Sequence, residues 1–249
     1  MSKKEVRVSK RQAIRDQRER KQRQQRTATI LVVGVIAVIV AALVIVPSVI
    51  RALAPVGEIF PISPVARPEG EGTALGNPDA PVRVEVFEDF QCPACRIYSE
   101  ETEPQVLDTY VAEGDVYYVY RHFPFLDDRA PGNESDQAAN AAMCAAEQGR
   151  FWDYHDMLFA NWNSENQGAF ADKRLVAFAD SLGLDADAFN ACFRENRYQD
   201  EIDADIADAV TYGVTGTPSV FVNGVQVTPG MVPTFEQLSA AIQAALAGG

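Results

Sequence analysis

Apolar and polar side chains follow the pattern of β-strands in three short stretches of the chain. Residues 82–88 alternate, residues 115–122 are rich in Val and Tyr, and residues 219–222 form a short apolar run. The Asn-Gly pair that follows this last run is typical of a hairpin turn, which leads into residues 225–228. The pattern therefore predicts a sheet assembled from distant parts of the chain.

Elsewhere the apolar positions recur every three to four residues, which predicts helices. Helices are expected at 96–112, 138–148, 151–162 and 173–182. Three more helical faces are formed by Phe189, Cys192 and Phe193, by Tyr198, Ile202, Ile206 and Val210, and by Phe235, Leu238 and Ile242. The order is strand, helix, strand, a block of helices, a hairpin and a helix. It predicts an α/β layer with an inserted helical subdomain.

A long apolar stretch precedes this domain. The 24 residues between Arg26 and Arg51 carry no charge, and at about 1.5 Å per residue they span a hydrocarbon core of about 30 Å. The stretch has no polar face, which argues against a buried core helix. We therefore predict a transmembrane helix at residues 27–50.

Charge divides the chain sharply at the start of this helix. Residues 1–26 hold 11 Lys and Arg and 3 Asp and Glu, so their net charge is +8, while the rest of the chain carries −21. Basic residues beside a membrane helix stay on the cytoplasmic side. We expect a basic cytoplasmic tail at 1–26, and the acidic balance of the remainder argues against nucleic-acid binding.

The alternative to an uncleaved anchor is a cleavable signal peptide, because Ala52-Leu-Ala54 resembles a cleavage site. The long charged region, an apolar stretch beyond the usual 7–15 residues and the following Pro55 count against cleavage. Residues 51–81 contain six prolines and four glycines, a composition that favours an extended linker. The folded domain is then expected at 82–249, with its helical insertion at about 130–212.

Two cysteines three positions apart, Cys92 and Cys95, lie where a predicted strand gives way to a predicted helix. At such a junction, backbone N–H groups and the helix dipole stabilise a thiolate on the first sulfur. Pro93 suits the first helical turn, where its missing N–H is not needed. This spacing predicts a redox site in which one disulfide opens and closes.

Several further segments occur together with this motif. They are Leu75–Val82, Phe87–Cys95, Tyr120–Pro124, Phe151-Trp152, His155-Asp156 and Gly216–Ser219. In this order the segments resemble the DsbA-like thiol–disulfide oxidoreductases, over about residues 73–247. The resemblance implies a thioredoxin-like fold with a helical insertion.

The resemblance also implies roles for individual residues. Cys92 would be the nucleophile of disulfide exchange and Cys95 the more buried partner that resolves a mixed disulfide. Pro218 would follow a cis peptide bond and face the disulfide, with the backbone of Thr217 pairing with an extended substrate. Taken without the resemblance, Pro218 could equally stand in a trans turn before a strand.

Two positions depart from the family pattern. Ala94 stands where strongly oxidising relatives carry a histidine, so a donor that favours the Cys92 thiolate is missing. Val86 stands where relatives are often acidic. Glu85, Glu88 and Asp89 are close enough in sequence to modulate proton transfer, although solvated charges at a strand end are the simpler interpretation.

Cys144 and Cys192 complete an even number of cysteines, which suits two disulfides in an exported domain. Related proteins with a cysteine pair in this insertion imply a structural disulfide between them; free buried thiols or a second redox pair are the alternatives. A zinc site is not expected, because 47 residues separate the second cysteine pair. Structural roles are expected for His122 and His155, and no cofactor signature occurs.

The sequence therefore predicts a single-pass, membrane-anchored thiol–disulfide oxidoreductase with its catalytic domain outside the cytoplasm. Its partners would be exported proteins with cysteine pairs and a quinone-linked reoxidant in the membrane. The same site run in reverse would make a reductase or isomerase. A binding or chaperone domain without redox activity is the alternative from another functional class.

Overall fold

A computed structural model describes residues 21, 26, 29–43, 45, 46, 49, 55–63, 65–128 and 132–248. The chain divides into two compact units, Met1–Pro55 and Val56–Gly249. In the first unit residues 29–43 are helical. Within the described part of the chain, no helix combines the length and the apolar character that a membrane span requires. Most of the predicted tail at 1–26 and parts of the predicted helix at 27–50 lie outside the described residues.

The second unit is built on a six-stranded sheet with the order β1-β2-β4-β3-β5-β6. Its strands are β1 (Gly70–Glu71), β2 (Ala74–Leu75), β3 (Val82–Glu88), β4 (Val116–His122), β5 (Ser219–Val222) and β6 (Val225–Val227). β3 pairs in parallel with β4, from Val82 opposite Val116 to Glu88 opposite His122. β3 also pairs antiparallel with β5, so the strand that precedes the cysteine pair lies inside the sheet.

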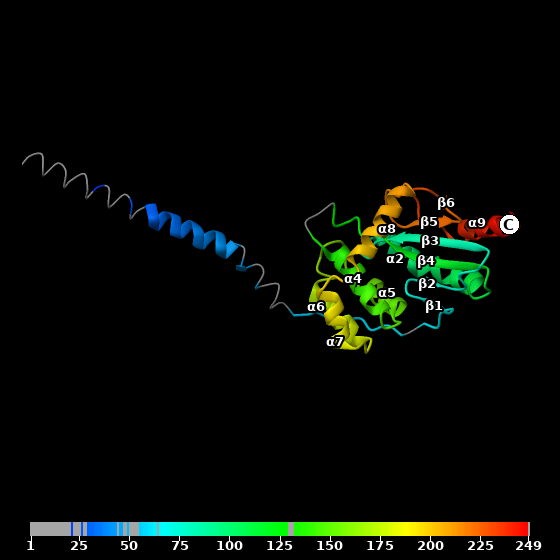
Figure 1. Ribbon diagram of the computed structural model, residues 1–249, viewed down its shortest axis with the longest axis horizontal. Coiled ribbons are helices and arrows are strands. Elements are labelled where there is room, and N and C mark those ends of the chain that lie inside the picture. Colours follow the sequence, from blue (N-terminus) through cyan, green and yellow to red (C-terminus); the bar gives the residue numbers. More distant parts are fainter. Residues whose placement is uncertain are drawn as a thin grey trace, which may run out of the picture. The chain divides into compact units, whose positions relative to one another are not determined.

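Helices pack around this sheet, as Figure 1 shows. They are α2 (Pro93–Glu101), α3 (Glu103–Val106), the π-helical η1 (Leu107–Val111), α4 (Glu134–Ala146), α5 (Phe151–Ala160), α6 (Asp172–Ser181), α7 (Ala186–Arg194), α8 (Gln199–Thr211) and α9 (Phe235–Gly248). The insertion between β4 and β5 contains α4 to α8. The thioredoxin-like α/β fold with a helical insertion is confirmed.

The single helix predicted at 96–112 is instead three consecutive helical segments, α2, α3 and η1. Pro104 lies just after the junction of the first two. A proline has no backbone N–H and its ring clashes with the carbonyl one turn earlier, so a regular α-helix does not continue through it. Thr102 remains tied to α2 by a 2.9 Å hydrogen bond from its N–H to the Tyr98 carbonyl.

The expectation of an extended linker at 51–81 is wrong for residues 56–81, which belong to the second compact unit. β1 and β2 form a hairpin, and β2 extends the sheet by pairing with β4. Ile59 and Ile62 pack against the hydrophobic core. The prolines of this segment are compatible with an extended chain, and Ile59 and Ile62 anchor it on the domain while Phe60 and Val65 stay exposed.

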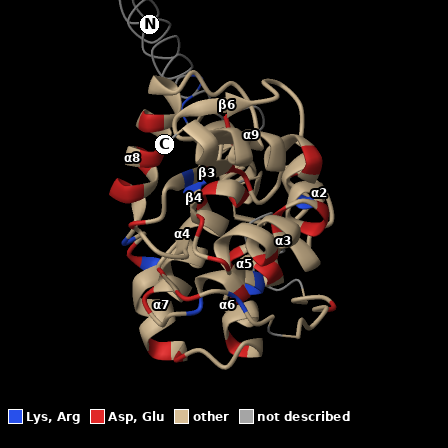
Figure 2. Ribbon diagram, turned by 90° about the vertical axis from the view of Figure 1, so that its right-hand side faces the viewer, with Lys and Arg blue, Asp and Glu red and all other residues tan. Residues whose placement is uncertain are grey.

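The face predicted for α8 is also partly wrong. Ile202 is buried, but Val210 is 71% exposed and Ala209 takes the inward position instead. The remainder of α8 is strongly acidic, as its red positions in Figure 2 show. A small alanine at the inner position lets the helix pack closely.

Candidate active site

The turn between β3 and α2 positions the two thiols. Cys92 is the N-cap of α2, with an extended backbone, and Pro93 is the first helical residue. The Cys92 N–H donates to the Asp89 carbonyl at 2.9 Å, and the Cys92 carbonyl accepts from the Arg96 N–H at 3.2 Å. These bonds fix the first sulfur at the start of the helix, where unpaired N–H groups are available to an anion.

The two thiols differ in their surroundings. Cys92 is 6% exposed, whereas Cys95 is completely buried, and both are free thiols in this structure. A hydrogen bond from Cys95 lowers the pKa of Cys92 from 9.0 to about 6, helped by the N–H groups of Ala94 and Cys95 and opposed by burial. Burial raises the pKa of Cys95 well above its ordinary value, and Cys92 and Glu88 add to this increase. Near neutral pH the charge therefore belongs on the first sulfur.

The loop before β5 faces the first sulfur. The Cys92 thiol donates to the Thr217 carbonyl at 3.4 Å, and the peptide bond between Thr217 and Pro218 is cis. Pro218 is buried and Thr217 is half-buried. The structure thus brings together all four residues that the sequence assigned to exchange and substrate binding, although they are more than 120 positions apart in the chain.

The three acidic residues near the turn are buried, so the interpretation as solvated charges is wrong. Glu85 accepts from Arg83 and from the Tyr212 hydroxyl, each at 3.0 Å. Glu88 ends β3, and neither of its carboxylate oxygens has a hydrogen-bond partner among the described residues. Burial raises the pKa of Glu88 well above 4.5, and the negative charges of Glu103 and Cys92 raise it further.

Asp89 has a different environment from Glu88. Its carboxylate accepts from the Gln91 N–H at 2.8 Å, the Ser135 hydroxyl at 2.7 Å and the Leu126 N–H at 3.0 Å. Burial nevertheless raises its pKa from 3.8 to about 7. Asp89 therefore holds the turn in place, whereas Glu88 lies beside Cys95, whose thiol opposes the rise in the pKa of Glu88.

The sequence analysis missed Gln91, which ties the turn to the helical insertion. Its side-chain amide donates to the Ser135 hydroxyl at 2.8 Å and accepts from the Asn166 N–H at 2.6 Å. Its carbonyl accepts from the Trp162 indole N–H at 2.7 Å. Only the position of Gln91 immediately before Cys92 could have drawn attention to it, because no spacing pattern includes it.

The second cysteine pair forms a disulfide that joins α4 to α7. The Cys144 and Cys192 sulfurs are 2.00 Å apart, their Cα atoms are 5.8 Å apart, and both residues are fully buried.

Both histidines are buried as well. His155 contacts Asp156 at 3.0 Å, and burial lowers the pKa of His122 to about 3. In the described part of the chain, no group of three or more Cys, His, Asp or Glu residues is placed to hold a metal ion.

Comparison with known families identifies the family to which this domain belongs. A family profile described as thioredoxin matches residues 69–244. The chain belongs to this thioredoxin family. The chain is 29% identical to the probable disulfide bond formation protein D of Bacillus cereus over 155 residues, which cover 61% of this chain and 69% of that protein. The solved structure of oxidised BdbD from Bacillus subtilis has a TM-score of 0.64 at 22% identity and covers 73% of this chain and 99% of that one.

A second kind of relative is a much longer protein. The chain is 38% identical to the Na(+)/H(+) antiporter NhaA 3 of Salinispora tropica over 149 residues, or 60% of this chain but only 21% of the antiporter. The similarity therefore concerns a part of that protein. The family profile, the disulfide bond formation protein and the BdbD structure together confirm the resemblance to the DsbA-like proteins and their thioredoxin-like fold.

Proposed function

We propose that this protein is a membrane-anchored thiol–disulfide oxidoreductase that forms disulfides in exported proteins by exchange through Cys92 and Cys95. The observation that carries the proposal is the asymmetry of the two thiols. Cys92 has a pKa of about 6 and some exposure, while Cys95 is fully buried with a raised pKa. Exchange requires one sulfur that leaves easily and a second that stays close to it.

In the oxidase direction a substrate thiolate attacks the Cys92 sulfur of the Cys92–Cys95 disulfide. The bond between the two enzyme sulfurs breaks, Cys95 leaves as a thiolate, and a mixed disulfide joins Cys92 to the substrate. A second substrate thiolate then attacks the substrate sulfur of this mixed disulfide, and Cys92 leaves as a thiolate. Two electrons pass from the substrate to the enzyme, and the low pKa of Cys92 favours its final departure.

Two neighbouring groups assist these steps. Glu88, whose pKa is raised well above its ordinary value by burial, would supply a proton to Cys95 as that sulfur leaves. The backbone of Thr217, whose carbonyl lies 3.4 Å from the Cys92 sulfur, would pair with an extended substrate segment. This arrangement would present a substrate sulfur to Cys92 rather than to the enclosed Cys95.

The anchor and the reoxidant belong to the same proposal. Residues 27–50 would span the membrane, with residues 1–26 in the cytoplasm and the domain outside it. A quinone-linked membrane protein would accept the two electrons and restore the disulfide. The protein should therefore stay with membranes after an alkaline carbonate wash, and protease added from outside should digest the domain. Release by the wash would contradict the anchor.

A reductase or isomerase working through the same site is the second candidate, because the pKa of Cys92 lies between the pKa values of the reactive cysteines in two reference proteins. Its value of about 6 lies between about 7 in thioredoxin, a reductant, and about 3.5 in DsbA, a strong oxidant. The transport activity in the name of the antiporter relatives is not part of the proposal, since those proteins are several times longer than the match.

The deciding experiment is the reduction potential of the full chain in detergent, measured in glutathione buffers with thiol trapping. A value at or above about −200 mV would support disulfide donation, and a value near about −270 mV would favour the reductase. If the Cys92–Cys95 pair did not exchange with glutathione at all, the domain would be a binding module instead.

A further inference from the structure

The segment that enters the domain carries an arginine that contacts the buried Glu103. We call residues 56–63 and 65–68 the strap; they precede the part of the chain that the family profile matches. The strap is held on α5 by two hydrogen bonds between Phe60 and Asn161, of 2.8 and 2.9 Å. Arg174 holds its beginning, donating to the carbonyls of Val56 at 2.7 Å and Glu58 at 3.1 Å.

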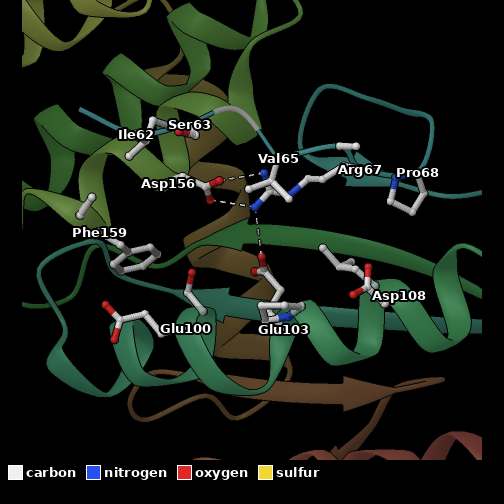
Figure 3. Close-up of a pocket in the computed structure, with 15 residues that line it drawn as sticks. Ile62, Ser63, Val65, Arg67, Pro68, Glu100, Glu103, Asp108, Asp156 and Phe159 are labelled. Atoms are coloured by element: carbon white, nitrogen blue, oxygen red, sulfur yellow. Dashed lines mark hydrogen bonds and ion pairs between the residues drawn. The ribbon is translucent and has the colours of Figure 1, made fainter. Parts of the chain in front are cut away.

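Arg67 reaches from the strap into a cavity of about 450 Å³ that is lined by the strap, α2, α3 and α5. Figure 3 shows its guanidinium between Asp156 and Glu103. Two hydrogen bonds of 2.9 and 2.7 Å join it to both carboxylate oxygens of Asp156, and it lies 3.7 Å from a Glu103 oxygen. Only 14% of the Arg67 side chain is exposed, so water screens these contacts weakly.

Glu103 is a buried carboxyl whose neighbours shift its pKa in opposite directions. It is 1% exposed, and the oxygen nearest to Arg67 accepts no hydrogen bond among the described residues. Its other oxygen accepts from the Tyr118 hydroxyl at 3.4 Å and lies 3.7 Å from a His155 nitrogen. Burial raises the pKa of Glu103, and Asp156 adds to this, whereas His155 and Arg67 oppose it.

The charge on Glu103 acts in turn on Glu88. After burial, Glu103 is the main cause that raises the pKa of Glu88, and Glu88 in turn acts on Cys95. The titratable groups that face the two carboxyls come from the strap, β4, α2 and α5: Arg67, Tyr118, Tyr120, Cys92, Cys95, Tyr98, His155 and Asp156. A path of direct electrostatic neighbours therefore runs from the strap to the buried thiol.

We propose that Arg67 is a positioning residue of the redox site: its guanidinium holds Glu103 as an anion, and this anion keeps Glu88 protonated beside Cys95. The inference rests on the proposed exchange through Cys92 and Cys95. When Cys95 leaves the disulfide as a thiolate, Glu88 gives it the proton and becomes a carboxylate, which solvent then reprotonates. The strap is thus part of the redox machinery as well as the entry to the domain.

The proposal predicts opposite changes at the two carboxyls when Arg67 is replaced by glutamine. Glu103 loses a cation, so its pKa rises and it becomes neutral; Glu88 then loses a negative neighbour, so its pKa falls. A direct effect of the lost cation would instead raise both values. Each unit by which the pKa of Glu88 falls lowers its protonated fraction about tenfold at a pH above that pKa.

The measurement is a pH titration of ¹³C-labelled glutamate carboxyls by NMR in the reduced full chain, assigned with Glu88→Gln and Glu103→Gln. Shifts of opposite sign in Arg67→Gln support the proposal, and shifts of the same sign or no shifts overturn it. Arg67→Lys should restore the wild-type values in part, because it keeps the charge. Arg174→Gln is the matched control: it loosens the strap without touching Glu103 and should leave both titrations unchanged.

A second variant separates charge from loss of structure. Glu103→Gln imitates the neutral acid, so this variant should lower the pKa of Glu88 as Arg67→Gln does. The double variant with Arg67→Gln and Glu103→Gln should show no further fall in the pKa of Glu88. An additional fall in the double variant would overturn the proposed path. The titrations do not depend on activity. If the wild type showed no thiol–disulfide exchange, the proposed function would be contradicted. If exchange were normal but the pKa values of Glu88 and Glu103 did not change in the variants, only this inference would be contradicted.

Discussion

The two cysteine pairs of this domain have the same chemistry and opposite surroundings. Cys144 and Cys192 lie on two helices, 48 positions apart, and both are fully buried. Cys92 and Cys95 lie within one turn of one helix, and only the first has some exposure and a lowered pKa. A symmetric, enclosed pair links two elements, whereas an asymmetric pair at a helix start can pass electrons.

The comparison shows that burial alone does not identify a redox cysteine, since three of the four sulfurs have no exposed surface. What distinguishes the first pair is the set of groups around Cys92: the start of α2, the Cys95 thiol and the Thr217 carbonyl. None of these is available to Cys144, which lies inside α4.

The largest expected effect comes from replacing Cys92 with serine. A hydroxyl cannot form the mixed disulfide, so exchange with a reduced, unfolded substrate protein should fall to the uncatalysed rate. The measurement is the rate of disulfide formation in that substrate. Cys144→Ala with Cys192→Ala should retain catalysis under conditions where the double variant is folded, and full activity in Cys92→Ser would contradict the mechanism.

The next effect concerns stability and involves the other pair. Removing the Cys144–Cys192 disulfide by double alanine substitution should cost about 4 kcal/mol for a loop of this length in the chain-entropy model. The measurement is the urea midpoint under reducing conditions that leave the buried disulfide of the wild type intact. Cys92→Ala should move this midpoint far less, because its thiol is not cross-linked under these conditions. A loss below about 1 kcal/mol would mean that packing of α4 on α7 holds the two helices without the bond.

The sequence was sufficient for the features that local patterns and family motifs record. Strand 219–222 and the start of α2 at Pro93 follow from apolar runs and proline preferences. The family motifs predicted that Thr217 and Pro218 lie beside Cys92, more than 120 residues away in the chain, which no local pattern could predict.

The rest depended on tertiary burial that one sequence does not reveal. Glu88 ends an alternating strand and reads as a solvated residue, yet it is buried and pairs with His122 of the parallel neighbour strand. The role of Arg67 was missed because a proline-rich composition suggests a linker, and composition does not report which side chains dock. Partners such as Asp156 are 89 positions from Arg67, so their contact appears only in the folded chain.

A smaller effect tests the source of the asymmetry within the first pair. Cys95→Ala removes the thiol whose hydrogen bond is the main cause of the low pKa of Cys92. We expect the pKa of Cys92 to rise from about 6 toward 9.0, by roughly one unit or more, or about 1.4 kcal/mol per unit. The measurement is the pH dependence of iodoacetamide alkylation, and an unchanged midpoint would assign the effect to the helix start alone.

The same lowered pKa makes the stability of the reduced protein depend on pH. Because the folded-state pKa of Cys92 is below its unfolded value, its contribution is present above about 9 and is lost as the pH falls through about 6. Cys95→Ala should weaken this dependence.

The smallest expected effect tests the residue between the two cysteines that departs from the family pattern. Ala94→His would place a donor and partial positive charge beside the Cys92 thiolate, at a half-buried position where screening is incomplete. A charge pair at a partly exposed site contributes about 0.2–1 kcal/mol, which for a two-electron couple raises the reduction potential by roughly 4–20 mV. Ala94→Gln supplies a polar side chain without a titratable charge. If both variants raised the potential equally, hydrogen bonding rather than charge would be the source of the change, and the gain of Ala94→His should then not vary between pH 6 and pH 8.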